Sequence, residues 1–248
     1  MARPALEALL REHRLDRTLT TALPPLDPHD EGAVASTGCS GLDAQLGGGF
    51  PRGQLSELIG LRSAGRTTLL LQTLAAATAR GELVAVIDAL DMFDVASAVA
   101  AKVDIDRLLW VRGHMTAHPG LCGDTNQRAL EQVVRALALV LQAGSFGVVV
   151  CDVAEAPAEA LRRLPFPTWL RIQRMLEGSQ TAGVLLGRES MARSSAGLTV
   201  RVDRTADEAR RIQTHVVRAR ASNQTARDRK STRLNSSHIP LSRMPSSA

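Results

Sequence analysis

A strand, a glycine-bounded turn and a helix follow one another between Glu57 and Leu71, and no other stretch constrains the fold as strongly. In a phosphate-binding loop, glycines let backbone N–H groups converge on an oxyanion, and the start of the helix adds unpaired donors. The Thr67 hydroxyl is then a ligand for Mg²⁺. The predicted phosphate site comprises Gly60, Ser63, Ala64, Gly65, Arg66, Thr67 and Thr68.

Arg66 departs from the phosphate-loop pattern G-x-x-x-x-G-K-[ST], which has lysine at this position. Arginine keeps the positive charge, but its guanidinium is longer, planar and forked, so it does not replace a point charge beside the β- and γ-phosphates. We therefore expect a site for ATP and Mg²⁺ with impaired hydrolysis. A glycine-rich turn that binds no ligand is the alternative.

Residues 228–248 back-translate into both ends of a common sequencing-library adaptor, so we expect this segment to be an artefact with no packed role. A natural serine-rich tail is the alternative. Without the segment, 26 Lys and Arg face 24 Asp and Glu, and the formal net charge falls from +5 to +2. Overall charge is then no reason to expect nucleic-acid binding, and any DNA contact must come from local clusters.

Composition predicts one α/β domain in the cytoplasm. Hydrophobic residues make up 44% of the chain, which is enough for a sizeable core. Cys39, Cys122 and Cys151 form no C-x-x-C pair, as is typical of a reducing compartment. We find no secretory leader and no apolar run of membrane-spanning length, so no membrane contact is expected.

Residues 1–32 are predicted to form a short amphipathic helix and a proline-rich linker, and residues 221–227 a native tail. Leu6, Leu9 and Leu10 share one face of the helix. Because so short a helix has little core of its own, we expect it to dock, either on a second copy of the chain or on its own domain.

Apolar runs and helical periodicities alternate after the phosphate loop, which predicts a mainly parallel sheet flanked by helices. We expect strands at 83–88, 103–111, 146–152, 182–187, 198–202 and 212–218, and helices at 69–80, 93–102, 125–143 and 168–177. Asp152 ends one of these buried strands. The second signature of a phosphate-loop site is a carboxylate at the carboxyl end of the neighbouring strand, where it reaches the Mg²⁺ shell. Asp152 is the candidate for this role; the alternative is that it caps the next turn.

His114, His118 and Cys122 are spaced four residues apart, a spacing that can hold zinc on a helix. Pro119 and Gly120 break any such helix, and no fourth ligand is evident. We therefore expect an ordinary loop here.

The segment before the phosphate loop carries a family resemblance. It contains Ser36-Thr37-Gly38, a Leu42-Asp43 pair, the run Leu46-Gly47-Gly48-Gly49 and the turn Pro51-Arg52-Gly53. Together these motifs resemble the RecA recombinase family, and the similarity extends from Leu6 through Arg220. The resemblance implies a RecA-like core at residues 33–220, ATP and Mg²⁺ as cofactors, single-stranded DNA as a partner and self-association through the N-terminal helix.

Three departures from the family pattern fall on parts that turn over ATP. The first is Arg66. The second is Leu90, which stands where the family has a water-activating glutamate; Asp91 is the remaining carboxylate candidate, with an N-cap of the helix at 93–102 as the alternative. The third is Gly187-Arg188, in place of an Asn-Gln pair that senses the γ-phosphate. The loop at 189–197 is also short, which weakens the case for strand exchange.

Arginines in the segments that correspond to the family's DNA-facing parts are candidates to neutralise DNA phosphates. They are Arg162, Arg163, Arg171, Arg174, Arg188 and Arg193. A solvated surface is the alternative, because acidic residues are interspersed.

The departures, with Asp106–Arg112 and Ala160–Leu164, resemble the ImuA group, damage-inducible proteins that accompany an error-prone polymerase. We expect an accessory protein of DNA repair and SOS mutagenesis that binds DNA, a translesion polymerase partner, or both. The alternative is an ATP-dependent recombinase that binds single-stranded DNA. Leu90 and the short loop favour the accessory protein.

Overall fold

The computed structural model describes residues 33–116, 123–165, 167–192, 195–205 and 212–219. The N-terminal helix and linker predicted within 1–32 lie outside the described residues, as do the predicted native tail and adaptor segment.

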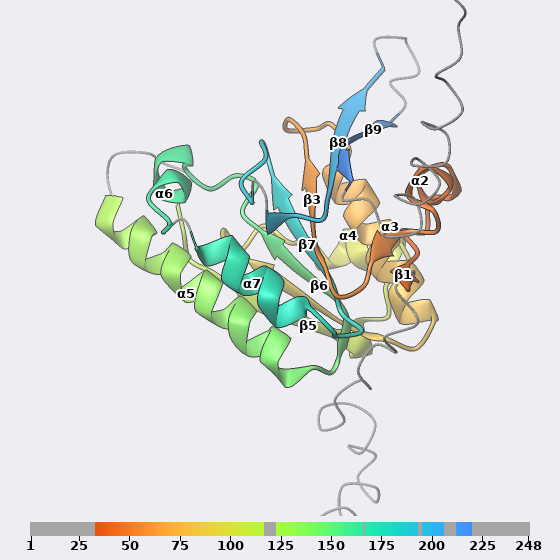
Figure 1. The fold of residues 1–248 in the computed structure, drawn as a ribbon, viewed down its shortest axis with the longest axis horizontal. Helices are drawn as coiled ribbons and strands as arrows, with labels where there is room; N and C mark the ends of the chain where they lie inside the picture. Colours follow the sequence, from red (N-terminus) through yellow and green to blue (C-terminus); the bar gives the residue numbers. More distant parts are fainter. Residues whose placement is uncertain (1–32, 117–122, 166, 193–194, 206–211, 220–248) are drawn as a thin grey trace, which may run out of the picture.

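A seven-stranded sheet is the centre of the described fold (Figure 1). Every neighbouring pair of strands is parallel except the last, in which β9 runs antiparallel to β8. The predicted mainly parallel α/β sheet is therefore confirmed. In spatial order the strands are β5 (Leu108–Arg112), β4 (Leu83–Asp88), β6 (Phe146–Asp152), β7 (Ala182–Gly187), β3 (Leu55–Ile59), β8 (Leu198–Arg204) and β9 (Ile212–Ala219).

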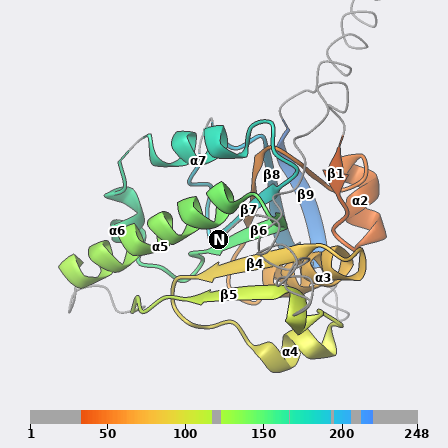
Figure 2. The same cartoon turned by 90° about the horizontal axis from the view of Figure 1, so that it is seen from below.

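Helices cover both faces of this sheet (Figures 1 and 2). One face carries α3 (Arg66–Ala79) and α4 (Val95–Ala100), and the other carries α5 (Gly123–Ala143), α6 (Ala158–Arg162) and α7 (Thr168–Leu176). None of the described helices is long and apolar enough to cross a membrane.

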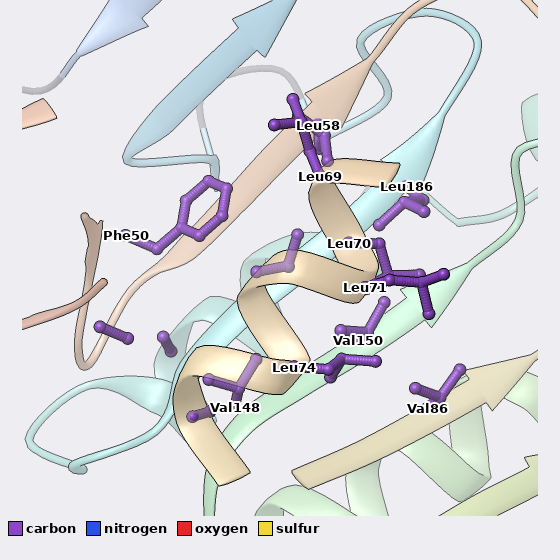
Figure 3. Close-up of a cluster of buried hydrophobic side chains, with 14 of the residues drawn as sticks. Phe50, Leu58, Leu69, Leu70, Leu71, Leu74, Val86, Val148, Val150 and Leu186 are labelled. Carbon is purple, nitrogen blue, oxygen red and sulfur yellow. The ribbon is translucent and has the colours of Figure 1, made fainter. Parts of the chain in front are cut away.

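The two-sided cover explains why the strands are almost continuously apolar, because each strand buries alternate side chains in opposite cores. In β6, Val148 and Val150 face the α3 core, whereas Val149 and Cys151 face the α5 core. Figure 3 shows the α3 core, in which leucines of the helix pack on the sheet. The labelled residues are Phe50, Leu58, Leu69, Leu70, Leu71, Leu74, Val86, Val148, Val150 and Leu186.

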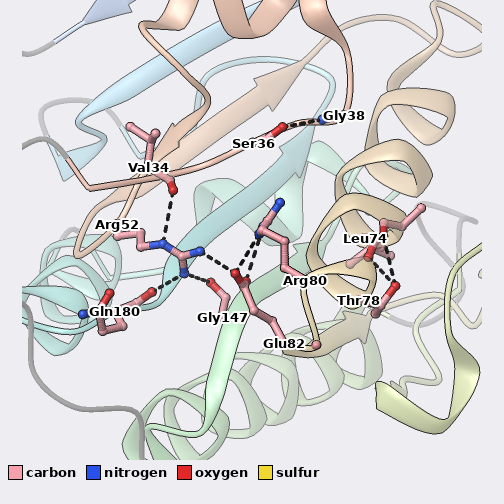
Figure 4. Close-up of polar contacts among 12 residues, drawn as sticks. Val34, Ser36, Gly38, Arg52, Leu74, Thr78, Arg80, Glu82, Gly147 and Gln180 are labelled. Carbon is pink, nitrogen blue, oxygen red and sulfur yellow. Dashed lines mark hydrogen bonds and ion pairs between the residues drawn. The ribbon is translucent and has the colours of Figure 1, made fainter.

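Arg52 fastens the amino ends of several strands together (Figure 4). It lies beyond a small two-stranded sheet, β1 (Val34–Ala35) paired with β2 (Phe50–Pro51), and the short helix α2 (Ser40–Leu46) that joins the two. Its guanidinium donates to the carbonyls of Val34, Gly147 and Gln180 at 3.3, 3.3 and 2.7 Å, and it pairs with Glu82 at 2.7 Å. The Pro-Arg-Gly turn thus has a structural role at the sheet edge opposite the site described below.

Three local predictions are wrong. The strand predicted at 103–111 begins only at Leu108, because Asp104 caps a short 3₁₀ turn, η1 (Ile105–Arg107), by accepting the N–H of Asp106. Helix α4 is shorter than predicted, and its N-cap is Asp94, which accepts the N–H groups of Ala96 and Ser97. Asp91 therefore does not cap this helix. The segment between β6 and α7, for which no helix was expected, contains α6.

Candidate functional site

The carboxyl ends of four parallel strands meet at one edge of the sheet. Residue pairing places Asp88 of β4 beside Asp152 of β6, and Ile59 of β3 beside Gly187 of β7. Strand β7 lies between β6 and β3, so the strand that ends in Asp152 is not the direct neighbour that the sequence predicted. Edges of this kind are where ligands bind in open α/β sheets.

A cleft of about 330 Å³ opens at this edge. The predicted phosphate loop and the strand that ends in Asp152 contribute to the same cleft. Its lining includes Ser63, Gly65, Arg66, Thr67, Thr68, Asp88, Leu90, Asp152, Glu155 and Arg204. Of the predicted loop residues, Gly60 and Ala64 do not line it.

The first turn of α3 presents unused backbone donors to the cleft. The helix has Gly65 as its N-cap, in the left-handed region at φ 113°, and no side chain caps it. Its first intrahelical bond runs from the Leu69 N–H to the Gly65 carbonyl at 3.1 Å. The N–H groups of Arg66, Thr67 and Thr68 precede that bond and have no partner within the helix, which is the arrangement that an oxyanion requires.

Strand β8 crowds the loop from the side. A Cβ on Gly60 would lie 2.4 Å from the Val202 carbonyl oxygen, so only glycine fits there. Arg204, at the end of β8, donates from Nε to the Ser63 carbonyl at 2.6 Å. Sequence reasoning missed Arg204, because nothing in the local pattern links the end of β8 to the phosphate loop.

Thr67 and Asp152 offer the two oxygen ligands expected for Mg²⁺. Thr67 is exposed in the cleft, and a hydroxyl and a carboxylate are ligands that this cation accepts. Burial raises the pKa of Asp152 to about 6; the Ala154 N–H lowers it, the Asp88 charge raises it and the Arg66 charge lowers it. The hydroxyl of Thr67 and the carboxylate of Asp152 are oxygen donors of the kind that Mg²⁺ binds, so the donor set fits the ion.

No group of three or more His, Cys, Asp or Glu able to hold a metal ion is found in the described part of the chain. His118 and Cys122, from the four-residue spacing that we assigned to a loop, lie outside the described residues.

Leu90 lines the cleft, and the two nearby carboxylates are already engaged. Asp88 accepts the N–H groups of Leu90 and Phe93 at 3.2 and 2.7 Å. Asp91 makes a two-bond ion pair with Arg112, at 2.7 and 2.6 Å, and does not line the cleft. The hydrogen bond from Arg112 lowers the pKa of Asp91. Neither aspartate is placed to replace a water-activating glutamate.

Arg66 is buried, with 7% of its surface exposed. Its guanidinium donates to the Gly187 carbonyl at 2.8 Å and pairs with Glu155 at 2.9 Å. The cation predicted to face phosphate thus already has protein partners.

Sequence reasoning also missed Glu57, which does not line the cleft but anchors the segment after β7. Its carboxylate is fully buried and accepts four hydrogen bonds from the segment after β7 and from β8. The donors are the Ser190 hydroxyl, the Met191 and Ala192 N–H groups and the Thr199 hydroxyl, at 2.6 to 2.9 Å. A glutamate inside an apolar parallel strand was the available signal, because a buried carboxylate requires donors.

The candidate DNA-binding arginines are exposed where they are described, and Arg193 lies outside the described residues. Arg163 pairs with Glu159 one helical turn away on α6. Arg162 belongs to α6, Arg171 and Arg174 belong to α7, and Arg188 directly follows β7. These positions leave their role in DNA binding a prediction.

The fold and the cleft define an α/β protein with a phosphate-loop site. The family described as RecA N-terminal domain matches residues 26–159, more than half of the chain, and the chain belongs to this family. It is 38% identical over 120 residues to Protein RecA of Desulforapulum autotrophicum, and 41% identical over 118 residues to that of Clostridium acetobutylicum. It is also 49% identical over 78 residues to Protein RecA of Sulfurovum sp..

These alignments cover 48%, 47% and 31% of this chain. They span 30%, 30% and 22% of the respective relatives, so the shared part is less than a third of each relative's length.

We expect Glu57→Gln to destabilise the protein by about 1–3 kcal/mol, because an amide offers one acceptor oxygen where the carboxylate offers two. Urea unfolding measures the loss, and hydrogen exchange should speed up at the Met191 and Ala192 amides. Glu189→Gln is the matched control, since Glu189 is exposed beside the same segment. Unchanged stability and exchange in Glu57→Gln would contradict an anchoring role.

We expect Asp152→Asn to stabilise the metal-free protein above pH 6, by on the order of 1–3 kcal/mol. The folded-state pKa of about 6 exceeds the unfolded value, so the folded state holds more protons in the window between. Wild-type stability therefore falls as the pH rises from about 4 to 6, and the advantage of the variant disappears toward pH 4. Urea titrations at several pH values measure the free energy of unfolding of both proteins. Asp106→Asn, at an exposed aspartate, is the control. A variant no more stable than wild type at pH 7 contradicts it.

Proposed function

We propose that this RecA-family protein is an accessory factor of DNA repair and SOS mutagenesis, and that its nucleotide site binds ATP with Mg²⁺ but turns it over poorly. DNA, a translesion polymerase partner, or both are its targets. The observation that carries the proposal is Leu90, which lines the cleft where the family's pattern has a water-activating glutamate.

The chain's own residues support binding better than hydrolysis. The N–H groups of the first turn of α3 are placed to hold phosphate oxygens, and Thr67 and Asp152 would hold Mg²⁺. The ion supplies charge neutralisation at the phosphates. At the position of the family's glutamate the cleft has the apolar Leu90. Of the carboxylates that line the cleft, Asp88 accepts two backbone N–H groups, Glu155 pairs with Arg66, and Asp152 is the proposed Mg²⁺ ligand. Loss of a general base typically lowers the rate by about 10²–10⁴-fold.

The segment after β7 supports an accessory role over strand exchange. In the recombinases that this chain resembles, the corresponding segment responds to nucleotide through an Asn-Gln pair at the end of the strand. Here Gly187-Arg188 replaces the pair, and Glu57 accepts hydrogen bonds from Ser190, Met191 and Ala192. We therefore expect the conformation of residues 190–192 not to depend on nucleotide.

The partner proposals come from sequence and family membership. Exposed Arg162, Arg171, Arg174 and Arg188 are available for phosphate contacts with single-stranded DNA. The apolar stripe of the N-terminal helix is proposed to dock on a second copy of the chain or on a polymerase accessory.

An ATP-dependent recombinase remains the second candidate. The open donors of the α3 first turn and the position of Asp152 in the cleft favour it.

We expect turnover of ATP by the unmodified protein to be weak and not stimulated by single-stranded DNA. The double variant Leu90→Glu with Arg66→Lys should restore part of the turnover, because it adds the glutamate and the lysine of the family pattern. Phosphate release with and without DNA measures the rates, and Leu61→Glu, on an exposed leucine of the same loop, is the control.

Robust DNA-stimulated turnover in the unmodified protein would contradict the accessory role and support the recombinase. Sedimentation with a translesion polymerase and with single-stranded DNA tests the targets, and failure to bind either would overturn the proposed function.

A further inference from the structure

Arg66 is held in place by acidic and carbonyl partners at the carboxyl ends of β6 and β7. One arm of its guanidinium bonds to the Gly187 carbonyl and the other to Glu155, which follows β6. A forked guanidinium can bond to two partners at once, which an ammonium of shorter reach does less well. The substitution of arginine for the pattern's lysine therefore permits an internal link that spans the cleft.

Negative charge surrounds this link. Asp88, Asp152 and Glu155 line the cleft with Arg66, and Arg66 is the only buried cation among the described residues. The other arginines of the lining, Arg62 and Arg204, are exposed. The negative charge of Glu155 already neutralises part of the positive charge of Arg66, so an entering anion is attracted less strongly.

We propose that Glu155 is an internal competitor of the phosphate, so that a polyphosphate gains the full attraction of Arg66 only when the Arg66–Glu155 ion pair opens. The inference rests on the proposed nucleotide site, and it makes Glu155 a residue that sets the affinity of that site for polyphosphates.

The competition follows from the geometry of the pair. An anion on the N–H groups of Arg66, Thr67 and Thr68 lies at the base of the same side chain whose tip Glu155 holds. If the tip moves to the anion, Glu155 loses its partner; if it stays, the anion adds to three nearby carboxylates. In the first case the closed pair is a competing state, and apparent affinity falls by the fraction of molecules in which the pair is open. In the second case repulsion from the carboxylates weakens binding directly.

Glu155→Gln tests the competition directly, because glutamine keeps the size of the side chain and removes its charge. Binding of inorganic tripolyphosphate and of ATP, each with Mg²⁺, is measured by calorimetry on the full chain. We expect Glu155→Gln to bind both ligands about tenfold more tightly than wild type. Glu155→Ala should also bind both ligands more tightly, and it tests the case in which the glutamine of Glu155→Gln still bonds to Arg66. Thermal unfolding verifies that the variants are folded.

Glu159→Gln is the matched control. It removes the same charge four residues away, from an exposed ion pair with Arg163 on α6, and it should leave the affinity unchanged. Loss of a merely structural ion pair would not tighten binding. Equal or weaker binding by both Glu155 variants, with measurable binding by wild type, overturns the competition alone. Absence of polyphosphate binding in wild type and all variants overturns both this inference and the proposed nucleotide site.

Discussion

The buried charge at the carboxyl edge of the sheet is the constraint on which the site depends. Two apolar cores leave the strand ends as the place where polar groups can converge. Three carboxylates do so, and Arg66 is the cation buried among them. Removing the buried cation from such a set would leave carboxylates uncompensated, which costs more than breaking an exposed ion pair does. The Arg66–Glu155 pair therefore connects the phosphate loop to the ends of β6 and β7.

Two other buried or partly buried side chains, Arg52 and Glu57, hold distant segments of the fold together. Arg52 fastens the amino ends of the strands through carbonyls and Glu82, so it positions the frame and not the cleft. Glu57 acts near the cleft, where it holds the segment after β7 by four hydrogen bonds.

Sequence reasoning reached the fold and part of the cleft lining, because both depend on local patterns. Strands β4, β6 and β7 have the bounds that their apolar runs predict, and the glycine-bounded turn places Thr67 in the cleft with Asp152. Contacts between distant segments were not predictable. Nothing near Arg66 in the sequence points to Glu155, and nothing near Glu57 points to Met191 or Ala192, because these partners meet only when the sheet assembles.

A crystal structure of the full chain with Mg²⁺ and a non-hydrolysable ATP analogue tests the central claim most directly. The claim is that the cleft is a phosphate site closed internally by Arg66 and Glu155. The predicted result has the phosphates on the N–H groups of Arg66, Thr67 and Thr68, with the guanidinium moved from Glu155 toward them. An analogue bound elsewhere, or bound in the cleft with the Arg66–Glu155 pair intact, would contradict it.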